Sequence, residues 1–142
     1  MIKVIMNGCN GHMGQVISEL IREDEKATIV AGIDVMDKRD NGYPVFTNIF
    51  DCDVEADVMI DFSSYKATDN VLLYCGQKKL PLVLCTTGLT PEQLDKLQET
   101  SKEVAVLRSA NMSLGINTLM KLIQDAAKVL ATAGFDMEIV EK

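Results

Sequence analysis

An apolar run that leads into a glycine-rich turn and then into a helical pattern constrains the fold of this chain more than any other feature. Residues 2–6 are typical of a buried strand, and Gly8, Gly11 and Gly14 follow it closely. Apolar residues then recur at the spacing of an amphipathic helix, namely Met13, Val16, Ile17, Leu20 and Ile21. Glycines at this spacing permit a tight turn and a close approach of the backbone to a pyrophosphate. The start of the chain therefore predicts a strand, a turn and a helix whose N-terminus can bind an anion.

Strand-like and helix-like segments alternate along the rest of the chain. Further strands are expected at residues 28–33, 58–62, 82–85 and 104–107, and helices at residues 67–77, 90–101 and 114–133. Apolar residues make up 47% of the chain and aromatic residues only 5%, so the core is aliphatic, as in a buried parallel sheet. The alternation predicts a doubly wound, mostly parallel α/β sheet with right-handed crossovers. In such sheets the ligand lies beyond the carboxyl ends of the strands.

Local signals mark several boundaries. Thr90 is the expected N-cap of its helix, with Pro91 as the first helical residue and Gln93 as the capping-box partner. Gly134 is expected to cap the end of the last helix, and residues 137–140 are expected to form one more strand. The stretch 35–56 is the least regular part of the chain.

The charge and the cysteines exclude several classes of protein. With a net charge of −7 and basic residues only in pairs, the chain is not expected to bind nucleic acid. The cysteines form no C-x-x-C pair, so neither a metal site nor a disulfide framework is expected for Cys9, Cys52, Cys75 and Cys85. The sequence has no signal-peptide layout and no apolar run of membrane-spanning length. We therefore expect a cytoplasmic protein without a membrane partner.

Asp34 lies twenty residues after Gly14, at the end of the second expected strand. A carboxylate in this position can accept hydrogen bonds from the hydroxyls of an adenosine ribose, although a solvated loop aspartate has the same appearance. Lys38 and Arg39 follow closely and are able to meet a 2′-phosphate instead. Asp34 favours NADH over NADPH, because a carboxylate facing a 2′-phosphate brings two negative charges together.

Two small polar loops follow the fourth and fifth expected strands, at residues 85–88 and 109–113. Each can offer backbone groups and hydroxyls to a ligand. Taken alone, each loop is equally consistent with an ordinary connection between elements. His12 is the one histidine, and we interpret it as a surface residue of the glycine loop and not as a catalyst. Tyr74 and Lys78 have the spacing of the Tyr/Lys pair of short-chain dehydrogenases, but they end a crossover helix on the side away from the cofactor, so we interpret this match as chance.

Taken together, these loops resemble the dihydrodipicolinate reductases of bacterial lysine and diaminopimelate synthesis. The resemblance runs the whole length of the chain and is carried by Gly8 to Gly14, Asp61-Phe62-Ser63, Thr86-Thr87-Gly88, Ala110 to Asn117 and Glu138 to Glu141. It implies that NADH or NADPH delivers hydride to a cyclic unsaturated dicarboxylate. The cofactor contacts that it implies are Gly8, Cys9, Asn10, Gly11, His12, Met13, Asp34, Cys85, Thr86, Thr87, Ser109, Ala110, Asn111 and Met112.

This sequence departs from the family pattern at three of those positions. His12 stands where arginine is usual, Cys85 where glycine is common and Met112 where phenylalanine is common. Each departure leaves a backbone contact possible and puts the side-chain contact in doubt.

The resemblance also implies two domains with different functions. Residues 1–133 would form the dinucleotide-binding domain, and residues 134–142 the first strand of a domain that binds substrate and forms a homotetramer. Its His-His-x-x-Lys stretch is expected directly after Lys142, so the chain alone is expected to be inactive and to expose apolar surface around Phe135, Met137 and Ile139. Two alternatives stay open: a stand-alone dinucleotide-binding or sensor module without catalysis, and a different Rossmann enzyme such as an epimerase.

Overall fold

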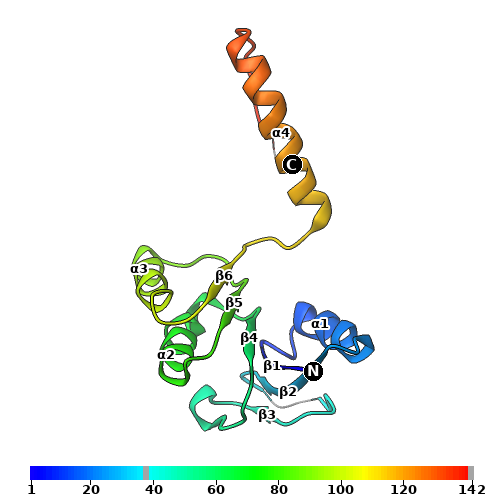
Figure 1. Ribbon diagram of the computed structural model, residues 1–142, viewed down its shortest axis with the longest axis vertical. Helices are drawn as coiled ribbons and strands as arrows, with labels where there is room; N and C mark the ends of the chain where they lie inside the picture. The colour runs from blue at the N-terminus through cyan, green and yellow to red at the C-terminus, as the bar shows by residue number, and fades with distance from the viewer. Residues whose placement is uncertain (37–38, 141–142) are drawn as a thin grey trace. The chain divides into compact units, whose positions relative to one another are not determined.

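A computed structural model describes residues 1–36 and 39–140 of the chain (Figure 1). The chain divides into two compact units, Met1–Ala110 and Asn111–Lys142. The boundary expected between residues 133 and 134 refers to a further domain of a longer protein, and it stays a prediction.

The described part of the first unit contains one sheet in which all strand pairs are parallel. Its spatial order is β3-β2-β1-β4-β5-β6. The direction of winding reverses between β1 and β4, which is where doubly wound sheets bind their ligands. The predicted fold class is confirmed. The strands are β1 (Ile2–Asn7), β2 (Ala27–Ile33), β3 (Val45–Phe46), β4 (Val58–Asp61), β5 (Leu82–Leu84) and β6 (Val106–Arg108).

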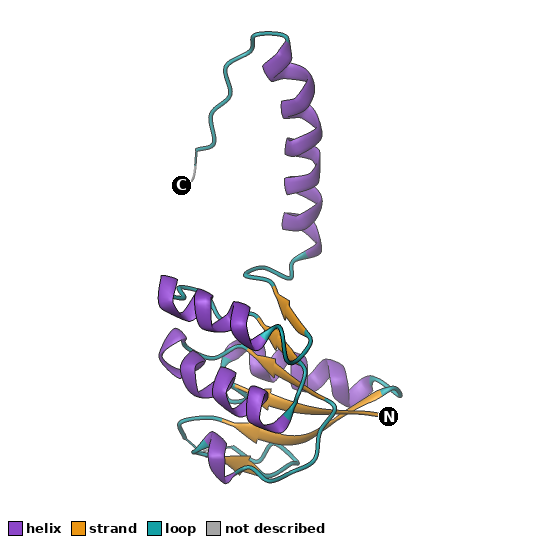
Figure 2. Ribbon diagram, turned by 60° about the vertical axis from the view of Figure 1, so that its left-hand side comes forward, coloured by secondary structure: helices purple, strands orange, loops and turns teal. Residues whose placement is uncertain are grey.

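Helices cover both faces of this sheet. Helix α1 lies on one face, and α2 and α3 lie side by side on the other (Figure 2). Three of the four predicted helices belong to this unit, namely α1 (His12–Glu23), α2 (Thr68–Lys78) and α3 (Pro91–Thr100). Two short 3-10 helices, η1 (Ile49–Asp51) and η2 (Tyr65–Ala67), lie in the connections. The predicted capping box is present, since the Thr90 hydroxyl accepts from the backbone N–H of Gln93 and the Gln93 side chain accepts from the N–H of Thr90.

The main core lies between the sheet and the α2/α3 layer. Met59, Leu82 and Leu84 are at most 1% exposed and pack with apolar residues of both helices. Side chains alternate between the faces of a strand, so Ile60, Val83 and Leu107 point to the opposite face. These three are aligned across β4, β5 and β6, and Leu107 is 56% exposed. The two faces of the sheet are therefore unequally covered within the first unit.

Helix α1 forms as predicted, but only part of its apolar stripe packs: Ile17 and Ile21 are half-buried, on the same side as Gly14 and Ser18. The buried residues of α1 are Gly14 and Ser18, whereas Met13, Val16 and Leu20 are 41%, 37% and 63% exposed. Small residues let the helix approach closely, and the Ser18 hydroxyl donates to the Gly14 carbonyl oxygen at 2.7 Å. The packed face of α1 is therefore centred on Gly14 and Ser18 and includes only one side of the apolar stripe.

The irregular stretch 35–56 contains β3 and η1, which the sequence pattern did not indicate. A strand of two residues is too short to show alternation. Asp34 directly precedes this stretch, and its backbone N–H donates to the carbonyl oxygen of Phe46 on β3. The candidate Lys38 lies outside the described residues.

The second unit consists of α4 (Leu114–Thr132) and the segment that follows it. Helix α4 is capped by the Ser113 side chain, and Gly134, with φ of 84°, comes one residue after the C-cap Ala133. The strand expected at residues 137–140 does not form, because a strand needs a paired neighbour for its backbone groups and the described part of the second unit contains no strand. As expected, Phe135, Met137 and Ile139 are exposed, at 63%, 50% and 88%.

None of the helices within residues 1–36 and 39–140 combines the length and apolar character that crossing a lipid bilayer requires.

Candidate functional site

The glycine loop after β1 is packed so tightly that two of its positions require glycine. Gly8 has φ of 79°, and a Cβ there would lie 2.5 Å from the carbonyl oxygen of Phe62, in the loop after β4. A Cβ on Gly14 would meet the Gly8 carbonyl oxygen and would lie 2.7 Å from the Cα of Cys9. The loop is therefore held between the first turn of α1 and the loop after β4.

The N-terminus of α1 carries no acceptor of its own. Its N-cap is Gly11, which has no side chain, and its first turn contains no acidic residue. By contrast, α3 and α4 are capped by the hydroxyls of Thr90 and Ser113. The first N–H groups of a helix need acceptors, and they favour an anion. The first turn of α1, where the exposed His12 is the first residue, can therefore bind an external phosphate.

Asp34 lies against the glycine loop, as its place at the end of β2 predicts. Its carboxylate accepts a hydrogen bond from the backbone N–H of Asn10 at 2.9 Å. Asp34 is half-buried, while Arg39 is exposed. The structure thus brings the predicted acid to the loop that it is expected to serve.

A second network ties the glycine loop to the segment before β3. Asn41 is 8% exposed. Its amide nitrogen donates to the side-chain oxygen of Asn10 at 2.9 Å. Its amide oxygen accepts a hydrogen bond from the side chain of Gln15 at 2.9 Å. Gln15 also donates to the carbonyl oxygen of Cys9 at 2.8 Å. Sequence reasoning missed Asn41 and Gln15, because one lies in a polar run and the other on a helix, without a distinguishing pattern.

A third network surrounds a carboxylate at the end of β4. Asp61 is fully buried. Its oxygens accept hydrogen bonds from Asn7 (2.7 Å), Ser63 (2.6 Å) and Thr86 (2.7 Å). Burial, together with the charge of Asp61, raises the pKa of the neighbouring Cys85 thiol to about 11. Sequence reasoning gave Asn7 and Asp61 no role in the site. The signal that could have indicated one is that each of these polar residues ends an apolar strand.

The other predicted cofactor residues are divided between buried and exposed positions. Cys85 and Thr86 are 4% and 5% exposed, whereas Thr87 is exposed and Ser109 is half-buried. The structure places these residues in the loops that follow β5 and β6. Ala110 is exposed at the end of the first unit, and Asn111 and Met112 begin the second unit.

Tyr74 and Lys78 do not form a catalytic pair. Tyr74 is 2% exposed, and its hydroxyl donates to the carbonyl oxygen of Cys52 at 2.8 Å. Burial raises the pKa of this phenol well above its usual value. Tyr74 is therefore a residue of the core.

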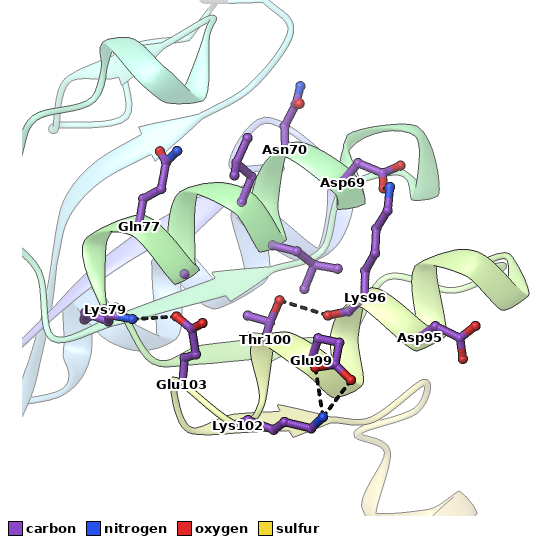
Figure 3. Close-up of a pocket in the computed structure, with 13 residues that line it drawn as sticks. Asp69, Asn70, Gln77, Lys79, Asp95, Lys96, Glu99, Thr100, Lys102 and Glu103 are labelled. Atoms are coloured by element: carbon purple, nitrogen blue, oxygen red, sulfur yellow. Dashed lines mark hydrogen bonds and ion pairs between the residues drawn. The ribbon is translucent and has the colours of Figure 1, made fainter.

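A groove lies between α2 and α3, but it is not the candidate site. Ion pairs line it, among them Asp69 with Lys96 and Lys79 with Glu103 (Figure 3). These side chains are between 45% and 65% exposed. None of the predicted cofactor residues lines the groove.

Comparison with known proteins identifies the family of this chain. Residues 2–112 match the family model described as dihydrodipicolinate reductase, N-terminus. The 4-hydroxy-tetrahydrodipicolinate reductases of Clostridium novyi and Caldanaerobacter subterraneus are 49% and 46% identical over 142 residues, all of this chain, which is 56% and 55% of those proteins. A dipicolinate-bound dihydrodipicolinate reductase from Paenisporosarcina sp. TG-14 superposes with a TM-score of 0.79 at 25% identity, covering 89% of this chain and 54% of that one.

The chain spans about half the length of the curated relatives that it matches. The family expected from the glycine loop and the later loops is confirmed. The chain belongs to the dihydrodipicolinate reductase family, whose N-terminal nucleotide-binding domain it carries.

Proposed function

We propose that this chain is the nucleotide-binding half of a 4-hydroxy-tetrahydrodipicolinate reductase, in which NADH or NADPH delivers hydride to a cyclic unsaturated dicarboxylate. The observation that carries the proposal is the first turn of α1, which has neither a side-chain cap nor an acid and begins at a tightly packed glycine loop. A dinucleotide pyrophosphate supplies the negative charge that this turn lacks.

The cofactor is proposed to extend from the glycine loop along the carboxyl edge of the sheet. The glycine loop, residues 8–13, holds the pyrophosphate, and Asp34 holds the adenosine ribose. The loops at residues 85–87 and 109–112 face the nicotinamide end. The hydrogen bond from the backbone N–H of Asn10 to the Asp34 carboxylate supports the ribose assignment, since it holds the carboxylate against the glycine loop.

NADH is proposed to bind somewhat more tightly than NADPH. A 2′-phosphate would stand beside the Asp34 carboxylate, and like charges repel. The exposed Arg39 close by in the chain offsets part of this repulsion, so the preference is modest.

Calorimetric titration of the folded chain with NADH tests the proposal. We expect saturable binding, and we expect Asp34→Ala to weaken it by about tenfold, or ~1.4 kcal/mol, as for a charge-assisted hydrogen bond. Asp95→Ala on α3 is the matched control, because it also removes a carboxylate but lies in the α2/α3 groove. No saturation by the folded protein would refute cofactor binding, and equal affinities for Asp34→Ala and the control would refute the ribose assignment.

The chain by itself is proposed not to reduce the dicarboxylate. Hydride transfer needs the acceptor held in line with the nicotinamide, cations for its carboxylates and an acid for the proton. Among the described residues, His12 belongs to the pyrophosphate end, and the strand ends of the sheet carry one cation, Arg108.

An assay that follows NADH absorbance tests whether the chain alone reduces the dicarboxylate. It compares the chain with a fusion that adds the remaining part of the Clostridium novyi relative. We expect turnover only from the fusion. Equal rates from both proteins would show that residues 1–142 contain the catalytic groups.

A cytoplasmic location and a homotetrameric assembly of the longer protein are proposed as well. The cytoplasm is supported by Cys52, Cys75 and Cys85, which are buried free thiols, as is usual in reducing compartments. A homotetramer is proposed for the longer protein, with the fusion as the sample for measuring mass in solution.

A further inference from the structure

The carboxylate of Asp61 joins the ends of three neighbouring parallel strands. Asn7 ends β1, Asp61 ends β4, and Thr86 follows β5. One carboxylate oxygen accepts from the Asn7 amide at 2.7 Å and from the Ser63 hydroxyl at 2.6 Å. The other accepts from the Thr86 hydroxyl at 2.7 Å. These strands adjoin the point where the sheet order reverses, where doubly wound folds bind ligands.

Two further hydrogen bonds close this network. The Asn7 amide also reaches the Ser63 hydroxyl at 3.2 Å, and the backbone N–H of Ser63 donates to the Thr86 hydroxyl oxygen at 3.1 Å. The Thr86 hydroxyl therefore donates to Asp61 and accepts from Ser63 at the same time. Its side chain is committed to the protein and not to a ligand.

Burial decides which role is open to Asp61. Its side chain is 0% exposed, so it cannot touch a bound molecule. A buried carboxylate is costly unless hydrogen-bond donors compensate it, and here every donor comes from a segment beside the glycine loop or the loop after β5. The glycine loop is itself in close contact with the loop after β4, because a Cβ on Gly8 would meet Phe62.

We propose that Asp61 is a positioning residue for the cofactor, which sets the spacing of the loops after β1, β4 and β5. Because its hydrogen bond occupies the Thr86 hydroxyl, the loop after β5 contacts the cofactor through backbone groups. This proposal rests on the proposed binding of NADH. It reassigns Thr86 from a cofactor contact to a part of the framework.

Three substitutions separate this role from a general loss of stability. Asp61→Asn keeps the shape but leaves one acceptor oxygen in place of two. Thr86→Val removes the hydroxyl with little change of volume, and Thr86→Ser keeps the hydroxyl. Tyr74→Phe is the control, because it removes one buried hydrogen bond, to the Cys52 carbonyl oxygen, that lies outside the network.

The experiment measures urea unfolding and NADH dissociation constants for the folded 142-residue chain and each variant. We expect Asp61→Asn and Thr86→Val to weaken NADH by about tenfold, equivalent to ~1.4 kcal/mol, whereas Thr86→Ser stays within about twofold. The variant carrying both Asp61→Asn and Thr86→Val should lose less than the sum of the single losses, because both act on one network. Tyr74→Phe should lose stability and keep its NADH affinity.

The outcomes are distinguishable. Variants that lose stability but bind NADH as tightly as the wild type would overturn the positioning role, since a purely structural residue behaves like Tyr74. If Asp61→Asn does not fold, the Thr86→Val and Thr86→Ser pair decides the question alone. A wild-type chain that does not bind NADH would refute the proposed function before any variant is compared, and the positioning role with it.

Discussion

Replacing Gly14 by alanine sets helix propensity against packing, and the structure indicates which effect prevails. Alanine is favoured over glycine in a helix by up to about 1 kcal/mol, so propensity alone predicts a more stable protein. The new Cβ, however, would meet the Gly8 carbonyl oxygen and lie 2.7 Å from the Cα and 2.8 Å from the carbonyl carbon of Cys9. All three are backbone atoms, which cannot swing aside.

The size of the required movement sets the magnitude. Ordinary contact begins at 3.4 Å, so α1 must withdraw from the Cα of Cys9 by the difference between 3.4 and 2.7 Å, and from the Gly8 carbonyl oxygen, which is nearer still, by more. Overpacking of this kind costs roughly 1–3 kcal/mol, and more where backbone must move. We expect Gly14→Ala to lower the free energy of unfolding by about 1–2 kcal/mol net of the propensity gain, and to weaken NADH because the first turn of α1 leaves the loop.

Gly76→Ala is the matched control. Gly76 lies within α2, and a Cβ there has no atom within 4 Å. The same substitution should therefore raise the stability by roughly 0.5–1 kcal/mol. Urea unfolding of both variants is the assay. A Gly14→Ala protein as stable as the wild type would show that α1 does not depend on this close approach, and the glycine loop would need another explanation.

Two further predictions concern the rest of the domain. Thr90→Ala should lower the free energy of unfolding by about 1 kcal/mol in urea, because it removes the hydroxyl that caps α3; an unchanged midpoint would contradict the capping box. Burial raises the pKa of Cys75 to about 12 and of Cys85 to about 11 from 9.0. Because these pKa values are raised in the folded state, the contribution of the two thiols to stability is constant below pH 9 and is lost as the pH rises toward 11–12; an equal urea midpoint at pH 8 and pH 10 would refute this burial.

Much of the fold could be predicted from the sequence, because its signals are local. The alternation of apolar runs with helical spacing located β1, β2, β4, β5 and β6 and the four α-helices. Thr90 and Gln93 identify the start of α3, since a capping box involves residues three positions apart. The glycine spacing indicated the turn between β1 and α1 for the same reason, and the later loops identified the family.

Only the tertiary structure decided which polar residues meet. Asp61 joins Asn7 across 54 residues and Thr86 across 25, and Asn41 reaches Asn10 across 31. No pattern within one helix or strand encodes such pairs, because they depend on the order of strands in the sheet. Packing also decided that α1 buries Gly14 and Ser18 and leaves Met13, Val16 and Leu20 of its apolar stripe exposed. The sequence by itself thus determined the elements and the nucleotide-binding loop, and the tertiary structure determined the hydrogen bonds that hold the loops in register, since these act between residues that are neighbours only after folding.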